Sequence, residues 1–128
     1  MDKKIIATGA ILGMIAIILG AFGAHALKKV LSIEELSTFE TGVRYQMYHA
    51  LFLIFIGMIN ELSQKAKKTI YNLVVFGVVL FSGSIYLLAT NSLTLFDFKV
   101  IGFVTPIGGL LLILAWGSLF LNLVKKKS

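Results

Sequence analysis

Uncharged apolar runs alternate with short charged segments along the whole chain. The first run covers residues 5–27, and the last covers residues 100–124. At a rise of about 1.5 Å per residue, a helix of about 20 residues crosses a hydrocarbon core of roughly 30 Å. The pattern therefore predicts a single membrane domain, residues 1–128, in which four helices span the bilayer, at approximately residues 5–27, 43–61, 70–90 and 100–124.

The second run is shorter and more polar than the others. Its uncharged part, residues 45–60, covers only about 24 Å as a helix. Arg44 lies at its start, so either its long side chain reaches outward to the interface or the helix starts within the interface.

The segment before this run predicts a short helix on the outer side of the membrane, between the first two spans. Ser32 with Glu35, and Ser37 with Glu40, have the spacing of capping boxes at helix starts. Apolar residues recur every third position, which suits a helix lying on the membrane surface or on the bundle. The expected fold is an all-α membrane protein, a four-transmembrane-helix bundle with one short outer helix.

Composition supports a membrane protein and excludes several other classes. The 128 residues are 58% hydrophobic and 14% charged, with a mean hydropathy of +0.93, which is too apolar for an ordinary soluble domain. The net charge of +6 falls in short clusters at the ends of apolar runs, so we expect membrane lipids rather than nucleic acid as the anionic partner. The absence of cysteine excludes disulfides and thiolate chemistry.

The distribution of Lys and Arg predicts the orientation. Eight lie beside the two termini and the second loop: Lys3, Lys4, Lys65, Lys67, Lys68, Lys125, Lys126 and Lys127. Four lie on the other side: Lys28, Lys29, Arg44 and Lys99. By the positive-inside rule, we expect a multi-pass protein of the inner (plasma) membrane with cytoplasmic N and C termini. The first run exceeds the core length of a secretory signal, so we interpret it as a span.

Small residues predict where helices pack closely. Those on the first helix form a stripe at spacings of three and four: Gly9, Gly13, Gly20 and Gly23. Those on the fourth span share one face: Gly102, Pro106 and Gly109. We expect a kink at Pro106, because proline removes one helical hydrogen bond. Ser82 and Tyr86 are expected to hydrogen-bond across helices.

Polar aromatic and ionisable residues predict one candidate pocket. His25 lies at the outer end of the first span and His49 one turn inside the outer end of the second, so an antiparallel pair brings both to similar depth. Arg44, Tyr45 and Tyr48 share a helical face with His49. Ionisable groups at membrane depth are candidate functional sites. The alternative is an interfacial or packing role, since all five residues lie near the predicted membrane surface.

Motifs of known catalytic chemistry are missing from the sequence. It has no phosphate-binding loop, zinc-protease motif, nucleophile elbow or paired carboxylates within a span, so we predict no catalytic residues and no enzyme. A haem held by the two histidines would need both, and two histidines alone are a weak signal. We therefore expect no cofactor and no metal site.

Four blocks carry a resemblance to a known family: GAFGAHALK, TGVRYQMYHALFL, FSGSIYLL and IGFVTPIGG. In this order they resemble the YgdD/YwdK-like family of small membrane proteins, catalogued as domain of unknown function 423. The resemblance implies a four-helix inner-membrane protein and no particular activity.

For function, we expect a non-enzymatic accessory or structural component of a membrane assembly, as a homo-oligomer or within a larger complex. The alternative is a module that binds or transports a lipid, quinone or other small molecule in the predicted pocket.

Overall fold

Helices account for all regular secondary structure in the part of the chain that the computed structural model describes, residues 2–95 and 97–125. The four long helices are α1 (Asp2–His25), α2 (Ile33–Met58), α3 (Gln64–Ala89) and α4 (Val104–Lys125). The connections contain three 3₁₀ turns: η1 (Leu27–Lys29), η2 (Asn91–Leu93) and η3 (Phe98–Ile101). The predicted all-α class is confirmed.

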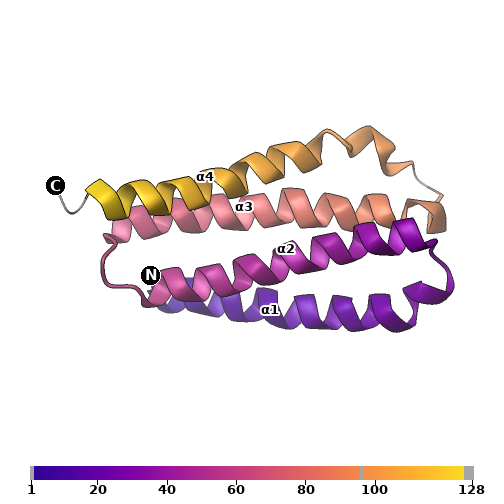
Figure 1. Ribbon diagram of the computed structural model, residues 1–128, viewed down its shortest axis with the longest axis horizontal. Coiled ribbons are helices and arrows are strands. Elements are labelled where there is room, and N and C mark those ends of the chain that lie inside the picture. The colour runs from indigo at the N-terminus through magenta and orange to yellow at the C-terminus, as the bar shows by residue number, and fades with distance from the viewer. Residues whose placement is uncertain (1, 96, 126–128) are drawn as a thin grey trace.

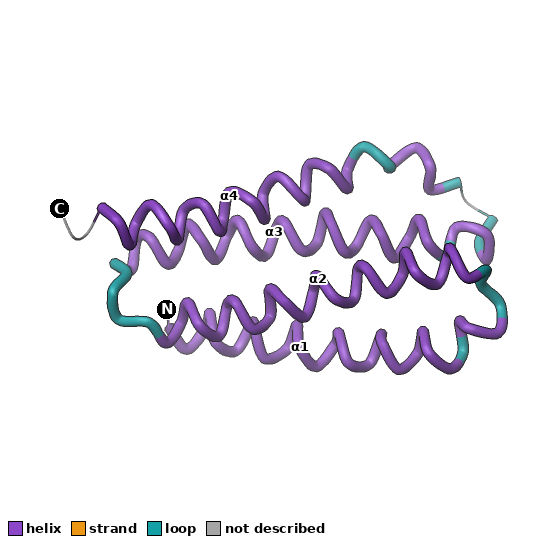
Figure 2. The backbone as a smooth tube through the Cα atoms, in the orientation of Figure 1, coloured by secondary structure: helices purple, strands orange, loops and turns teal. Residues whose placement is uncertain are grey.

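The four helices run along one long axis, and consecutive helices are antiparallel (Figures 1 and 2). α1 packs against α2, α3 against α4, and α2 against α3. The N-terminus, the end of α4 and the α2–α3 connection lie at one end, which we call the terminal end. The α1–α2 and α3–α4 connections lie at the other, which we call the loop end (Figure 1). Two of the lysines counted for orientation, Lys126 and Lys127, lie outside the described residues.

The main core joins residues from all four helices. Ile5, Leu53, Ile70 and Val74 are fully buried in it, and Leu112 of α4 closes one side. A smaller cluster lies at the loop end, where Phe39 packs near Leu27 and Leu31. The bundle therefore has two apolar clusters, the larger of which joins all four helices.

Three stretches are long and apolar enough to cross a membrane: Asp2–Lys29, Gln64–Ala89 and Phe98–Lys125. α2 is as long as α3, with 26 residues each. What distinguishes α2 is its polar content, with Arg44, Gln46 and His49 within four turns of helix. Two of these, Gln46 and His49, are only 4% exposed and face inward, whereas Arg44 is exposed.

The short outer helix is not a separate element, because its residues form the first turns of α2. The predicted capping box at Ser32 is present: the Glu35 N–H donates to Ser32 Oγ (3.0 Å) and the Ser32 N–H donates to Glu35 Oε1 (2.9 Å). Ser37, predicted as a second cap, lies inside α2. The helix continues through Gly42, where a Cβ would come within 2.7 Å of the Tyr86 ring.

Replacing Ser32 with alanine is expected to destabilise the start of α2 by about 1 kcal/mol, because one N–H of the first turn loses its acceptor. Ser37→Ala, inside the helix, is the matched control and is expected to be neutral or slightly stabilising. Amide hydrogen exchange over residues 33–36 measures the effect. Equal exchange in the two variants would show that the Ser32 cap contributes nothing.

The same cap makes the start of α2 sensitive to acid. The Ser32 N–H that donates to the Glu35 carboxylate lowers the pKa of that carboxyl. A lowered pKa means that this stabilisation is present above the unfolded value of about 4.3 and is lost as pH falls through the folded value. Exchange over residues 33–36, relative to the intrinsic rate at each pH, is therefore expected to rise as pH falls through the lowered pKa of Glu35, and Glu35→Gln is expected to remove that response.

Pro106 does not kink a continuous helix, because α4 begins at Val104 and Pro106 lies in its first turn. η3 ends before it, and the N–H of Gly102 closes η3 on the Lys99 carbonyl at 3.0 Å. The first turn of a helix has no internal partner for its N–H groups, so proline fits there without breaking a bond. The span predicted from residue 100 is thus a 3₁₀ turn followed by a helix.

The glycines of α1 lie on the side that faces α2. A Cβ on Gly9 would come within 2.6 Å of the Ala50 carbonyl oxygen, and one on Gly23 within 3.1 Å of Phe39. Gly13 and Gly20 have ordinary contact distances of 3.6 and 3.5 Å. The backbones of α1 and α2 therefore approach most closely near Gly9.

The glycines predicted on the fourth span behave differently from one another. A Cβ on Gly102 would come close only to the Lys99 carbonyl oxygen, which lies in the same turn. A Cβ on Gly109 would lie 3.4 Å from the Phe81 ring. The tightest approach is at Gly108, which the sequence did not single out: a Cβ there would overlap the backbone of Leu80 and Phe81. α4 therefore crosses α3 at Gly108.

Candidate functional site

His49 forms the centre of the candidate site. It lies on α2 and is only 4% exposed. Its Nδ1 is 2.7 Å from the Tyr45 carbonyl oxygen, and its Nε2 is 3.0 Å from Nε1 of Trp116 on α4. The Trp N–H is only a donor, so Nε2 must accept and the imidazole proton must lie on Nδ1, which donates to Tyr45. Both ring nitrogens are therefore used, and the imidazole links α2 to α4.

Aromatic rings surround this pair. The Trp116 ring lies 4.1 Å from that of Phe52 and 6.0 Å from that of His49, between centroids. Beside them is a cavity of about 320 Å³, open at the surface between α2, α3 and α4, which we call the His49 cavity. It is lined mainly by Tyr45, His49, Phe81, Leu112, Ile113 and Trp116.

The structure brings together only part of the predicted pocket. Tyr45 and His49 line the His49 cavity, and Tyr48 packs its ring against Tyr45 at 5.5 Å. Arg44 is exposed and donates from Nη2 to Thr41 Oγ1 at 3.1 Å. His25 is exposed at the end of α1.

The structure does not place His25 and His49 at the similar depth that was expected. Ala50, next to His49, lies opposite Gly13 of α1. His25 is twelve residues further along α1, which is about 18 Å of helix. The error arose because the second span was expected to begin near residue 43, whereas α2 begins at Ile33. His49 therefore lies near the middle of the bundle rather than at the loop end.

Gln46 is a second buried polar residue, and the sequence analysis did not single it out. Its Nε2 donates to the Leu12 carbonyl of α1 at 2.9 Å, and its Oε1 accepts from the Tyr86 hydroxyl of α3 at 2.6 Å. One turn away, Ser82 Oγ donates to the Gly42 carbonyl at 2.7 Å. The predicted hydrogen bonds of Ser82 and Tyr86 across helices are therefore present. This group fastens α2 to both neighbours.

Single side-chain hydrogen bonds join two further pairs of helices. Thr8 of α1 meets the Tyr71 hydroxyl of α3 at 3.0 Å, and Ser84 of α3 meets Thr105 of α4. Among the described residues, every buried side-chain nitrogen or oxygen has a partner. The interior polar groups are thus engaged in holding helices together, as interhelical hydrogen bonds do in membranes.

Lys67 is an ionisable residue inside the terminal end, although its position in the second loop suggested a solvated charge. It is 2% exposed, and its Nζ lies 3.2 Å from Asp2 Oδ1 and 3.4 Å from the Gly57 carbonyl. Gln64 also donates to Asp2, at 3.0 Å. The ammonium therefore lies at the C-terminal end of α2, where the helix dipole favours positive charge. No group of three metal-ligating side chains occurs among the described residues.

Comparison with known proteins identifies relatives along nearly the whole chain. Residues 19–109 match a family model described as "Protein of unknown function (DUF423)". A UPF0382 membrane protein of Staphylococcus saprophyticus is 42% identical over 123 residues, covering 96% of this chain and 98% of the relative. The UPF0382 membrane protein YwdK of Bacillus subtilis is 38% identical, with coverage of 96% and 98%.

A third relative carries a location in its name. The UPF0382 inner membrane protein YgdD of Escherichia coli is 36% identical over 121 residues, covering 92% of this chain and 87% of the relative. No solved structure matches the chain.

Proposed function

Because the chain belongs to the DUF423 family, whose members are membrane proteins of unknown function, we propose that it is a non-enzymatic accessory or structural component of a membrane assembly. In this proposal all four helices span the inner membrane and both termini face the cytoplasm. α2 also crosses the membrane, in addition to the stretches identified above, since it matches α3 in length and directs Gln46 and His49 into the bundle.

One observation carries the proposal: the polar side chains of the interior are engaged with other helices. The buried Gln46, His49 and Ser82 each hydrogen-bond to a different helix. A nucleophile with its base needs a side chain that is available to a substrate. This interior favours a rigid packing unit over an active site.

Cysteine labelling tests the proposed topology. Because the chain has no cysteine of its own, only the introduced residue reacts. Ser63 lies at the terminal end and Ser37 at the loop end, and both are exposed. A membrane-impermeant thiol reagent added outside intact cells is expected to label Ser37→Cys and to leave Ser63→Cys unlabelled until the membrane is opened. Labelling of Ser63→Cys from outside would reverse the orientation.

The accessory role is tested by native mass spectrometry of the tagged full-length protein, extracted with its surrounding bilayer. A component of an assembly is expected at a defined stoichiometry with other chains or with its own copies. An unrelated four-span protein with the same tag is the control for chance association. Detection of the 14.0 kDa chain alone, with lipid only, would overturn the accessory role.

The His49 cavity favours a second candidate function, the binding of a flat apolar molecule such as a quinone. Its volume of about 320 Å³ falls within the range of small-molecule sites, and aromatic rings form its walls. Ile113→Trp is expected to fill the cavity and to deplete such a molecule from organic extracts of the purified protein. Ile18→Trp, on the exposed side of α1, is the matched control. Identical extracts from both variants would exclude this candidate.

A further inference from the structure

A second surface feature of the bundle lies between α3 and α4, next to the His49 cavity, with which it shares Ile113. It is a groove of about 520 Å³ that we call the α3–α4 groove. The residues that matter to its chemistry are Thr69, Leu73, Gly117, Leu121, Asn122 and Lys125. Its middle is apolar, and its polar side chains gather where α4 ends.

Gly117 opens the groove in the middle of α4. Nothing lies within 4 Å of the position that a Cβ on Gly117 would occupy, so the glycine serves no close helix contact. Leu73 on α3 and Leu121 on α4 also line this apolar part. The missing side chain therefore leaves a hollow that faces outward from the bundle.

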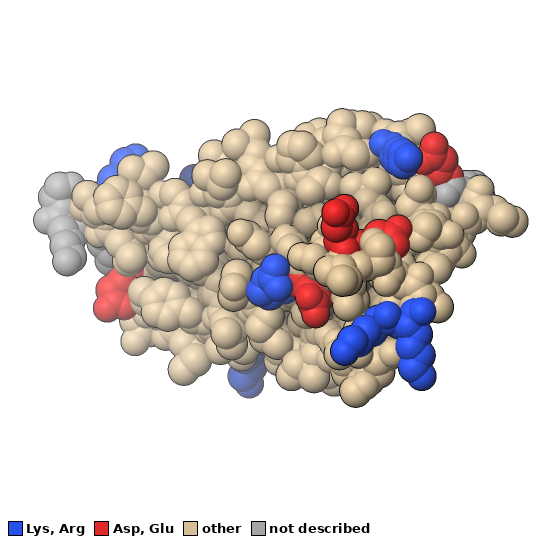
Figure 3. Space-filling view, turned by 45° about the vertical axis from the view of Figure 1, so that its right-hand side comes forward, with Lys and Arg blue, Asp and Glu red and all other residues tan. Residues whose placement is uncertain are grey.

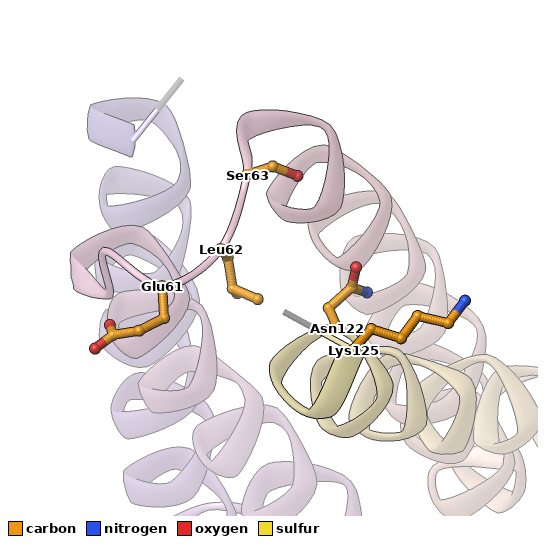
Figure 4. A pocket seen from close by; sticks show the side chains of 5 residues that line it. All are labelled: Glu61, Leu62, Ser63, Asn122 and Lys125. Carbon is orange, nitrogen blue, oxygen red and sulfur yellow. The ribbon is translucent and has the colours of Figure 1, made fainter. Parts of the chain in front are cut away.

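The polar end of the groove continues into a second hollow of about 300 Å³. Both hollows share Asn122 and Lys125, and the second is also bounded by Ser63 and Glu61 (Figure 4). Asn122 Nδ2 donates to the Ser118 carbonyl at 2.7 Å, which holds the amide in place. In Figure 4 the carboxylate of Glu61 and the ammonium of Lys125 point to opposite sides. The acidic group therefore faces away from the basic one.

Charge at the two ends of the bundle differs. The described part of the terminal end carries six lysines and two carboxylates, whereas the loop end carries four basic and four acidic residues. Figure 3 brings the loop end forward and shows acidic and basic side chains there together. Lys65 lies one turn before Thr69 on the same face of α3, so it adds positive charge beside the groove.

The length of the groove matches one leaflet of a bilayer. From Lys125 to Ile113, the lining of α4 covers twelve residues, or about 18 Å. Half of a hydrocarbon core of roughly 30 Å is about 15 Å. An acyl chain lying in the groove thus reaches the midplane while its headgroup meets the polar end.

We propose that the α3–α4 groove is a binding site for one anionic phospholipid, with an acyl chain over Gly117 and the phosphate near Lys125 and Lys65. Lysines are point-charge partners for phosphate, and the positive charges of Lys65 and Lys125 lie beside the polar end of the groove. The proposal requires only a membrane location, so it holds or fails independently of the accessory role.

Native mass spectrometry of the full-length protein tests this site directly. The purified chain is incubated with equal amounts of dioleoyl phosphatidylglycerol and dioleoyl phosphatidylcholine, which differ only in their headgroups. Wild type is expected to retain phosphatidylglycerol preferentially. The double variant Lys65→Gln, Lys125→Gln is expected to lower that preference about tenfold. Lys28→Gln, Lys29→Gln removes two charges at the loop end and is expected to leave it unchanged.

Gly117→Leu provides an independent test of the acyl chain position. The leucine fills the groove, so retention of both lipids is expected to fall while the melting temperature stays at the wild-type value. Gly83→Leu, also in open space, is the matched control and should retain lipid normally. The proposal is overturned if either the double variant or Gly117→Leu keeps wild-type lipid retention. It is also overturned if the loop-end control loses as much preference for phosphatidylglycerol as the double variant, or if a second copy of the chain occupies the groove as a dimer.

Discussion

Replacing Gly108 with alanine is expected to reduce the free energy of unfolding by about 3 kcal/mol, the upper part of the range for overpacking. The added Cβ overlaps the backbone of Leu80 and Phe81. A flexible side chain can rotate away from such an overlap, but a helix backbone cannot, so α4 has to move off α3. Because Leu112 and Ala115 of α4 are buried in the main core, that movement also opens the core.

Gly117→Ala is the matched control, since it makes the same chemical change on the same helix. Its Cβ enters open space, and alanine favours a helix over glycine by up to about 1 kcal/mol. Reversible unfolding in mixed micelles, followed by circular dichroism, measures both variants. Equal stability of Gly108→Ala and Gly117→Ala would show that α3 and α4 do not cross at Gly108.

The hydrogen bond between Trp116 and His49 is expected to contribute about 1 to 2 kcal/mol to stability. Trp116→Phe keeps an aromatic ring against Phe52 but removes the N–H that His49 Nε2 accepts. A buried acceptor without a donor costs about this much. Reversible unfolding of the purified variant is the measurement.

A double-mutant cycle separates the hydrogen bond from the change in ring size. In the His49→Leu background no acceptor is left, so Trp116→Phe is expected to cost about 1 kcal/mol less than in wild type. Phe120→Leu, at an exposed position of the same helix, controls for the loss of aromatic surface. A coupling energy of zero would show that the two rings lie side by side without a stabilising bond.

The sequence predicted the helices well because their signals are local. Apolar runs, the Ser32 capping box and charged segments each depend on a few neighbouring residues. These placed the helical segments and a helix start at Ser32, although that helix was expected to be separate from the second span. The break before α4 was missed for the same reason. Proline was expected to kink a continuous helix, but Pro106 lies in the first turn of α4, and where that turn begins depends on where η3 ends.

The candidate site was predicted less well because it depends on which helices meet. His49 was expected at a similar depth to His25, but it lies deeper and hydrogen-bonds Trp116, 67 residues away. Trp116 carried a usable signal, since a single indole N–H within an apolar helix needs an acceptor. Gln46 carried the same signal as an amide on a membrane helix. Neither signal identifies the partner helix, which follows only from the register between α2 and its neighbours.

The contact between Asp2 and Lys67 has a consequence for how the protein is made. The two residues are 65 positions apart, so α1 and α2 leave the ribosome well before α3 supplies the ammonium. Asp2 stays without this partner throughout that interval, so the α1–α2 hairpin lacks the ion pair that holds its N-terminus. Arrival of α3 then fixes the beginning of the chain, so the start of the protein reaches its final position only after half of the sequence has been translated.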